Sequence, residues 1–117
     1  MDIEAIRAYC LKKKRTDEGF PFDDTTLVIK VGGKIFVLIS LDGGPSVNLK
    51  CDPDLAIDLR EANPAIIPGY HMNKKHWNTV ILDGSLSRTL ILQMIDHSYD
   101  LVLKSLPRNQ RLETEQL

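Results

Sequence analysis

Three segments of the chain carry their apolar residues at the spacing of a helix. The first begins after Asp2, a good capping residue, and ends in the basic run of residues 12–15, whose charges suit the C-terminal end of a helix. The second begins at Asp52, another capping residue, with a proline at the first helical position. The third spans residues 86–106, with Ser85 as its expected cap and a wide apolar stripe for packing on a sheet.

Five shorter segments are rich in β-branched and apolar residues and are expected to form strands. Gly32 and Gly33 join the first two as a tight hairpin, because glycine tolerates the positive φ angles of a two-residue turn. Residues 16–24 are expected to form an acidic, solvated loop, and the short fourth strand is expected to pair with the fifth. The predicted strands are residues 25–31, 34–40, 46–51, 70–72 and 77–82.

The order of elements is therefore α-β-β-β-α-β-β-α. This order predicts an α+β fold, a two-layer sandwich in which an antiparallel sheet carries helices on one face. We expect a single domain over residues 1–107 and a polar C-terminal tail, residues 108–117, that frays.

The predicted strand at residues 34–40 has apolar side chains on both faces. Successive side chains of a strand point to opposite sides, so Ile35, Val37 and Ile39 oppose Phe36 and Leu38. Helices cover one face of the sheet, and the second face needs a cover of its own. A loop, the tail or a second subunit would provide it.

Composition narrows the classes of function. The chain has 117 residues, of which 43% are hydrophobic, and a formal net charge of −1. A net charge so close to zero argues against a protein whose whole surface binds nucleic acid, but it is compatible with a local basic patch. No signal peptide is expected from the first ten residues, and there is no apolar run of about 18 residues and no CxxC motif. We expect a soluble cytoplasmic protein, not associated with a membrane, with two reduced thiols.

Residues 70–80, YHMNKKHWNTV, hold two histidines, two lysines and the single tryptophan. His71 and His76 would supply at most half of a zinc site, so we expect neither a metal nor another cofactor. Elsewhere there is no GxSxG motif, and neither cysteine neighbours a base in sequence. We therefore expect a non-enzymatic protein without catalytic residues and identify no small-molecule substrate.

Three stretches carry a resemblance to a known family: PFDDTTLVIKVGGKIFVLIS, GYHMNKKHWNTVILDG and SYDLVLKSLP. In this order they resemble the MmcQ/YjbR family of small bacterial proteins, over nearly the whole chain from Ile3 to about Pro107. The resemblance implies a fold likened to the frataxin-type (CyaY-like) and secretion-chaperone-like folds, and a "double-wing" DNA-binding motif. It implies no catalytic residues. An iron site of the frataxin type is not expected, because the first helix offers only Asp2 and Glu4 before four cations.

Two functions follow as hypotheses. The first is a DNA-binding protein of unresolved cellular role that contacts double-stranded DNA through basic hairpin wings. The residues expected to contribute are Lys74 and Lys75, on phosphates, and Lys34, Lys30, His76 and Trp77. Residues 12–15 form a further basic cluster, besides Lys74 with Lys75 and Lys30 with Lys34. The alternatives are an exposed turn for Lys74 and Lys75 and, for Trp77, burial under the last helix.

The second hypothesis is a protein-interaction module, such as a homodimer formed through the apolar second face of the sheet.

Overall fold

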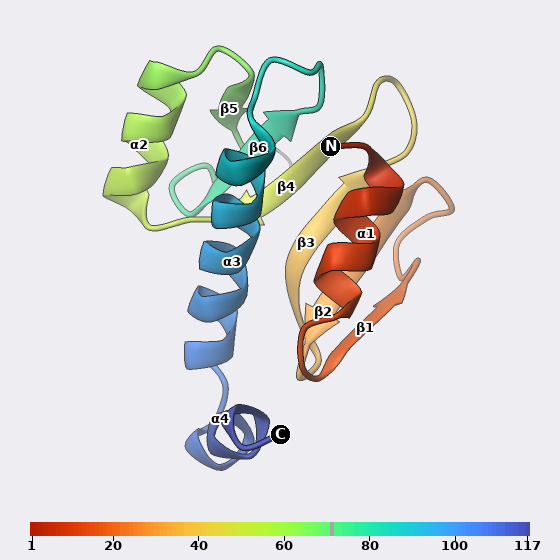
Figure 1. Cartoon of the computed structure of the whole chain (residues 1–117), viewed down its shortest axis with the longest axis vertical. Helices are drawn as coiled ribbons and strands as arrows, with labels where there is room; N and C mark the ends of the chain where they lie inside the picture. Colours follow the sequence, from red (N-terminus) through yellow and green to blue (C-terminus); the bar gives the residue numbers. More distant parts are fainter. Residues whose placement is uncertain (71) are drawn as a thin grey trace.

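A computed structural model describes residues 1–70 and 72–117 as four helices and one six-stranded antiparallel sheet (Figure 1). The helices are α1 (Ile3–Leu11), α2 (Pro53–Ala62), α3 (Arg88–Lys104) and α4 (Arg108–Glu115). The strands are β1 (Thr16–Gly19), β2 (Thr26–Val31), β3 (Lys34–Ser40), β4 (Ser46–Lys50), β5 (Ile66–Pro68) and β6 (Trp77–Ile81). Across the sheet they follow the order β1-β2-β3-β4-β6-β5. Helices α1, α2 and α3 pack against the sheet, so the predicted α+β fold is confirmed.

Side-chain caps fix the starts of the three predicted helices. Asp2 accepts a hydrogen bond from the Ala5 N–H (2.8 Å), and Asp52 caps α2 in the same way. The cap of α3 is Ser87, two residues later than expected, whose hydroxyl accepts from the Leu90 N–H (3.1 Å). Helix α1 stops at Leu11, before the basic run. None of the helices in the described part of the chain is long and apolar enough to cross a membrane.

Strand β1 lies in the segment expected to be a loop. It pairs antiparallel with β2 at the edge of the sheet, and Glu18 within it forms an ion pair with Arg7 of α1. The sequence TDEG has low intrinsic strand propensity. The backbone ladder with β2 and the contact with α1 therefore impose a strand that local sequence does not indicate.

The short strand beside β6 is present but displaced. It was expected at residues 70–72 and lies instead at Ile66–Pro68, paired with β6. Proline is tolerated there because β5 is an edge strand, so the backbone groups along one of its edges have no neighbouring strand to pair with. The central residue of the predicted segment, His71, lies outside the described residues.

The last ten residues differ from the frayed tail that the sequence suggested. Arg108–Glu115 forms helix α4, which begins directly after Pro107. The Arg15 guanidinium donates to the Gln110 carbonyl (3.5 Å) and pairs with Glu113 (3.5 Å). These contacts hold the polar helix against the turn that follows α1, and Figure 1 shows it beyond the end of α3.

A one-residue β-bulge in β3 changes which side chains enter the main core. Ile29 pairs with Val37, but the next residue of β2, Lys30, pairs with Ile35, so Phe36 is the extra residue. Phe36 therefore joins Val37 in the core beneath the helices, where its ring meets Tyr99 edge-on (centroids 5.3 Å apart). The expected strict alternation along this strand is wrong at Phe36, which joins the main core, and at Ile35, which lies on the second face with Leu38.

A smaller apolar cluster occupies the second face of the sheet. Its buried members are Val28, Leu38 and Trp77, and Ile35 and Met72 pack against them. Trp77 is buried, with 8% of its surface exposed, but on this face and not under α3. It lies three residues from Val80, which faces the helices, so the two side chains point to opposite sides. The loop that carries Met72 supplies part of the cover that this face needs.

Ser98 joins α3 to the sheet at the bulge. It is fully buried, donates its hydroxyl proton to the Phe36 carbonyl (2.6 Å) and accepts from the Lys50 N–H (3.0 Å). The neighbouring Tyr99 hydroxyl donates to the Lys14 carbonyl (2.8 Å), so it reaches the turn after α1 and not the sheet. One serine hydroxyl thus satisfies two backbone groups of adjacent strands.

Replacing Ser98 by alanine removes both hydrogen bonds and leaves two buried backbone groups without partners. We expect Ser98→Ala to lower the free energy of unfolding by about 1–3 kcal/mol. Urea denaturation followed by the fluorescence of the single tryptophan measures this loss. The matched control is Ser105→Ala, at the exposed residue that follows the last turn of α3, whose hydroxyl donates only to the Val102 carbonyl of that helix. An equal effect of the two substitutions would contradict this role of Ser98.

Candidate nucleic-acid interface

Lys74 and Lys75 lie in the turn between β5 and β6, and both side chains are exposed. The Asn73 carboxamide oxygen accepts from the Lys75 N–H (2.9 Å), which shapes the turn. The Lys74 amino group lies 5.0 Å from the centre of the Tyr70 ring, itself 60% exposed. The two ammonium groups are therefore displayed to solvent beside an exposed aromatic ring.

The hairpin between β2 and β3 is docked on the rest of the protein. Its tip is a glycine pair with positive φ angles, Gly32 (55°) and Gly33 (85°). The Gly32 N–H donates to the Arg15 carbonyl (3.0 Å), and Lys34 donates from its amino group to the Ser105 carbonyl (3.1 Å). This tip is therefore not a free wing, and Lys34 lies against the C-terminal end of α3.

The remaining predicted residues are in less accessible positions. Lys30 is half-buried in β2, and Asp17 lies directly opposite it on β1. His76 is also half-buried, and its carbonyl accepts from the Cys51 N–H (2.8 Å). Trp77 lies within the apolar cluster of the second face. Stacking of Trp77 on a base would require this ring to leave its packing.

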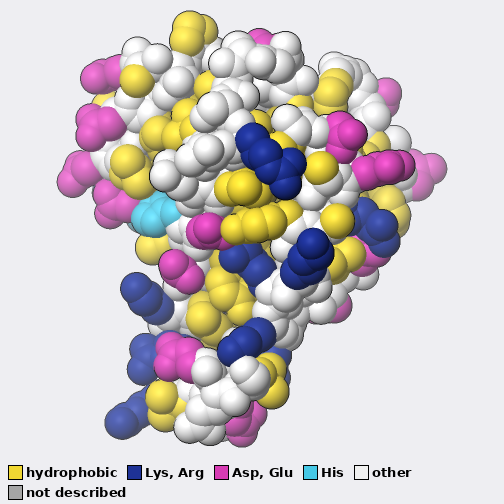
Figure 2. Space-filling view, in the orientation of Figure 1, with side chains coloured by type: hydrophobic (Ala, Val, Ile, Leu, Met, Phe, Trp, Pro, Cys, Tyr) yellow, Lys and Arg dark blue, Asp and Glu magenta, His cyan; other side chains and the backbone are white. Residues whose placement is uncertain are grey.

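Separate basic stretches meet at the end of the molecule that carries α4. The hydrogen bonds of Arg15 to α4, of Gly32 to Arg15 and of Lys34 to Ser105 tie them together. We call this region the basic end and define it as residues 12–15, Lys34, Lys104, Arg108 and Arg111. It holds eight of the 15 Lys and Arg residues, four from the run and four others. Figure 2 shows Lys and Arg side chains gathered toward the α4 end and acidic side chains over α2.

Two cations of the basic end form ion pairs within the fold. Lys13 forms an ion pair with Asp96 (2.7 Å) and lies 4.9 Å from the centre of the Tyr99 ring. Arg15 pairs with Glu113. Within the described part of the chain, the other six cations of the basic end form no ion pair. Asp100 and Glu115 are the nearby acids in the sequence of α3 and α4 that reduce the local positive potential.

The sequence pointed to only part of this region. It marked residues 12–15 and Lys34, but Lys104, Arg108 and Arg111 were passed over. The available signal was the spacing of Arg108 and Arg111, which places both on one face if the segment is helical. A frayed tail, the expectation for this segment, has no such face.

Metal binding and thiol chemistry have little support in the described residues. No group of three or more His, Cys, Asp or Glu side chains there could hold a metal ion. Burial raises the pKa of Cys10 to about 12 and that of Cys51 to about 11. Both thiols are therefore protonated at neutral pH, and neither is an activated nucleophile.

Comparison with known proteins places the chain among a group without a defined role. The family model described as YjbR matches residues 11–101. The uncharacterized protein YbdF of Escherichia coli O157:H7 is 42% identical over 93 residues, which cover 79% of this chain and 76% of that protein. The uncharacterized protein YjbR of Escherichia coli K12 is 35% identical over 112 residues, 95% of each chain.

Solved structures agree with the fold. The crystal structure of Deinococcus radiodurans protein DR2400, described with the family-model domain DUF419, superposes with a TM-score of 0.90 at 38% identity. The match covers 97% of this chain and 87% of that one. A crystal structure from Pseudomonas syringae has a TM-score of 0.77 at 30% identity, covering 87% and 99%.

Gly69 sets the path of the chain into the turn that carries Lys74 and Lys75. Its N–H donates to the Trp77 carbonyl (2.9 Å). A Cβ atom on Gly69 would lie 2.8 Å from the Trp77 Cβ and 2.9 Å from the Trp77 carbonyl oxygen. Real Cβ atoms do not approach a backbone so closely, so β5 and β6 would have to separate at this point.

We expect Gly69→Ala to lower the free energy of unfolding by about 1–3 kcal/mol, the usual cost of overpacking. Thermal denaturation followed by circular dichroism measures it. Gly19→Ala is the matched control, because a Cβ there meets nothing within 4 Å, and the change should be under about 1 kcal/mol. Equal stability of the two variants would show that the turn tolerates a side chain at Gly69.

Proposed function

The chain belongs to the YjbR family, and from the clustering of its cations we propose that it binds duplex DNA through phosphate contacts made by the basic end. The observation that carries this proposal is the meeting of residues 12–15, the β2–β3 tip and the α3–α4 junction at one end of the molecule. Clustered Lys and Arg side chains bind a duplex by displacing its condensed counterions. A net charge of −1 does not prevent this, because the acidic side chains lie largely elsewhere.

The turn with Lys74 and Lys75 would make a second contact. Trp77 pairs with Lys50, and Leu49 pairs with Val37, so the start of β6 and the β2–β3 tip lie at the same end of the sheet. The exposed lysines of this turn are therefore two strands away from the hairpin tip. In this arrangement the basic end supplies most of the phosphate contacts. The turn extends the contact along the end of the sheet where the hairpin tip and the start of β6 lie.

Binding at the basic end predicts a steep salt dependence that specific substitutions reduce. The affinity for a duplex of about 20 base pairs, measured by fluorescence anisotropy, should fall with salt with a slope of about −0.9 per phosphate contact. Arg108→Ala/Arg111→Ala should reduce the magnitude of that slope by about two units, and so should Lys74→Ala/Lys75→Ala. Three of these side chains are exposed and Arg111 is half-buried, and none forms an ion pair in the described residues, so both variants should stay folded.

The control is Arg88→Ala, which removes an exposed cation from the opposite end of α3. Its slope should match the wild type. A folded protein that does not bind DNA at low salt would refute the proposal. An unchanged slope for Arg108→Ala/Arg111→Ala would refute the basic end as the contact, even if the turn variant weakened binding.

The second sheet face favours a second candidate function, self-association. A groove over Leu38 is lined on one side by Phe22, which is 65% exposed, and on the other by Met72. Asp23 and Asp24 follow Phe22 in sequence, and Lys74 and Lys75 follow Met72. A two-fold axis over the groove would bring the acidic rim of one copy to the basic rim of the other, as an isologous interface requires.

Self-association through this face predicts a dimer whose population rises with concentration. Sedimentation velocity should show it, and Phe22→Ser should shift the equilibrium toward the monomer by removing an exposed aromatic contact. Leu117→Ser, an equally exposed apolar residue in the C-terminal segment, serves as the control and should leave the equilibrium unchanged. A monomer at every concentration would exclude this function.

A further inference from the structure

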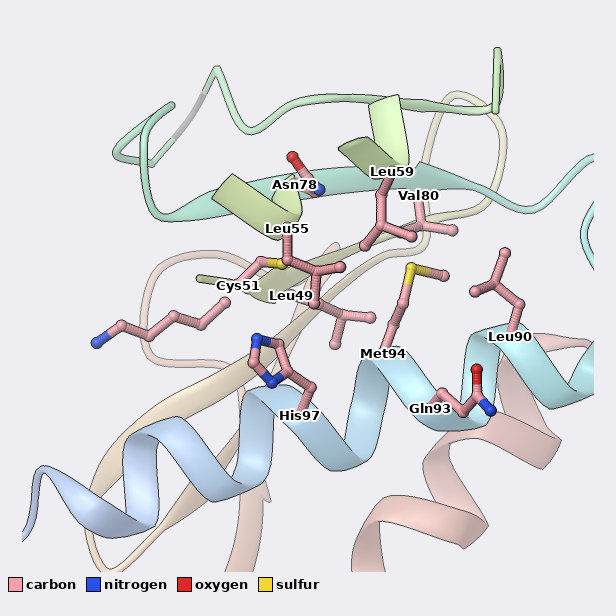
Figure 3. A pocket seen from close by; sticks show the side chains of 11 residues that line it. Leu49, Cys51, Leu55, Leu59, Asn78, Val80, Leu90, Gln93, Met94 and His97 are labelled. Carbon is pink, nitrogen blue, oxygen red and sulfur yellow. The ribbon is translucent and has the colours of Figure 1, made fainter. Parts of the chain in front are cut away.

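An apolar cavity of ≈ 110 Å³ opens between α2, α3 and the sheet (Figure 3). Leu49 of β4 and Val80 of β6 form its floor. Helix α2 contributes Leu55 and Leu59, and α3 contributes Leu90 and Met94 as the facing wall. The cavity is separate from the basic end and from the groove on the second sheet face, and neither proposed function uses it.

The cavity exists because the two helices pack on different parts of the sheet. Helix α2 covers β5 and β6, whereas α3 covers β2, β3 and β4. Ala56 is the one buried residue of α2, and Leu55 remains 39% exposed although it faces the cavity. A hydrogen bond from the Asp52 N–H to the His97 Nε2 (3.1 Å) joins the start of α2 to α3 and fixes the separation at one end.

Asn78 lies on the same face of β6 as Val80, so it contributes a polar group to the floor of the cavity. The Asn78 carboxamide accepts from Arg60 (2.8 Å) and donates to the Ala56 carbonyl (3.4 Å), so both of its polar atoms have protein partners. Lys50 also lines the cavity, and among the described residues it forms no ion pair. A ligand would therefore meet a mainly apolar interior and, at Lys50, an ammonium group that can pair with an anion.

We propose that this cavity binds a small amphiphilic carboxylate, with an aryl or short acyl group against Leu49, Val80 and Met94 and its carboxylate beside Lys50. The cavity, ≈ 110 Å³, is smaller than an engineered apolar cavity of about 150 Å³ that accommodates benzene in another protein, so part of an aryl or short acyl ligand would extend into the mouth. An apolar pocket with few polar groups at its edge is the usual form of a small-molecule site. The open mouth leaves room for the head group in water.

The methionine methyl groups provide a direct test on the whole chain. There are three methionines, and only Met94 lines this cavity, so Met1 and Met72 serve as internal references. In protein labelled with ¹³C at the methionine methyls, benzoate should shift the Met94 signal saturably and leave the other two in place. For a ligand of this size the dissociation constant should be on the order of 1 mM.

Two substitutions at the mouth should block binding without disturbing the core. Leu55→Trp and Gln93→Trp place an indole over the opening from opposite walls, and each should weaken benzoate binding at least about tenfold, the effect of losing a well-packed apolar group. Ile57→Trp is the matched control, since Ile57 is an exposed α2 residue outside the lining. It should bind like the wild type.

The carboxylate contact has its own test. Lys50→Gln should weaken benzoate binding by about threefold and leave benzyl alcohol binding unchanged, because only the anion interacts with the ammonium group. Lys104→Gln, an equal loss of charge elsewhere, should change neither. The absence of a saturable Met94 shift would overturn the proposal, and so would equal benzoate affinity of Leu55→Trp, Gln93→Trp and Ile57→Trp. An equal effect of Lys50→Gln on both ligands would overturn the choice of a carboxylate.

Discussion

The bulge at Phe36 and the buried hydroxyl of Ser98 determine how the two layers of this fold meet. The bulge turns Phe36 toward the helices, where its ring packs on Tyr99, and leaves its carbonyl accessible to Ser98. The same hydroxyl accepts from Lys50 of β4, so α3 is fixed to two adjacent strands at one point. Leaving those backbone groups unpaired inside the core would cost more than the hydrogen bonds gain, which makes the position of α3 strongly specified.

That position brings the cations of the chain together. With α3 fixed at Ser98, its C-terminal end reaches the β2–β3 tip, where Lys34 donates to the Ser105 carbonyl. Carbonyls at the end of a helix favour a cation, so this contact is favourable on its own. The crowding of the other cations is unfavourable, because like charges in one region repel. Asp96 and Glu113 offset only Lys13 and Arg15. An anionic partner would offset the remainder.

Local patterns predicted the elements whose ends and faces are marked in the sequence. Asp2 and Asp52 cap helices as expected, and the glycine pair forms the turn between β2 and β3. The features that escaped prediction depend on distant partners. The sequence of β1 is polar and becomes a strand by pairing with β2, and α4 is held by Arg15, more than ninety positions from Gln110 in the chain. The bulge at Phe36 inserts one residue into the two-residue alternation of β3, and the pattern of apolar residues does not mark where the insertion lies.

The same reasoning explains the partial success with the candidate site. The sequence marks Lys74 and Lys75, which are exposed in the turn before β6, but the expected burial of Trp77 under the last helix places it on the wrong face. A tryptophan between a polar turn and a strand fits either side of a sheet, and only the register of β6 decides between them. The basic end was harder to predict, because its cations are adjacent only after α3 and α4 are in place.

The apolar cavity and the basic end share helix α3, and the hydrogen bonds of Ser98 lie between them. Met94 lines the cavity one turn before Ser98, whereas Lys104 and α4 follow it. To pass a signal from the cavity to the basic end, a ligand would have to shift α3 along the sheet. Such a shift would break two buried hydrogen bonds, at about 1–3 kcal/mol of cost for each group left unpaired. A ligand that gains its affinity from a few apolar contacts has too little binding energy to do this. The two proposed sites on helix α3 would therefore be energetically separate.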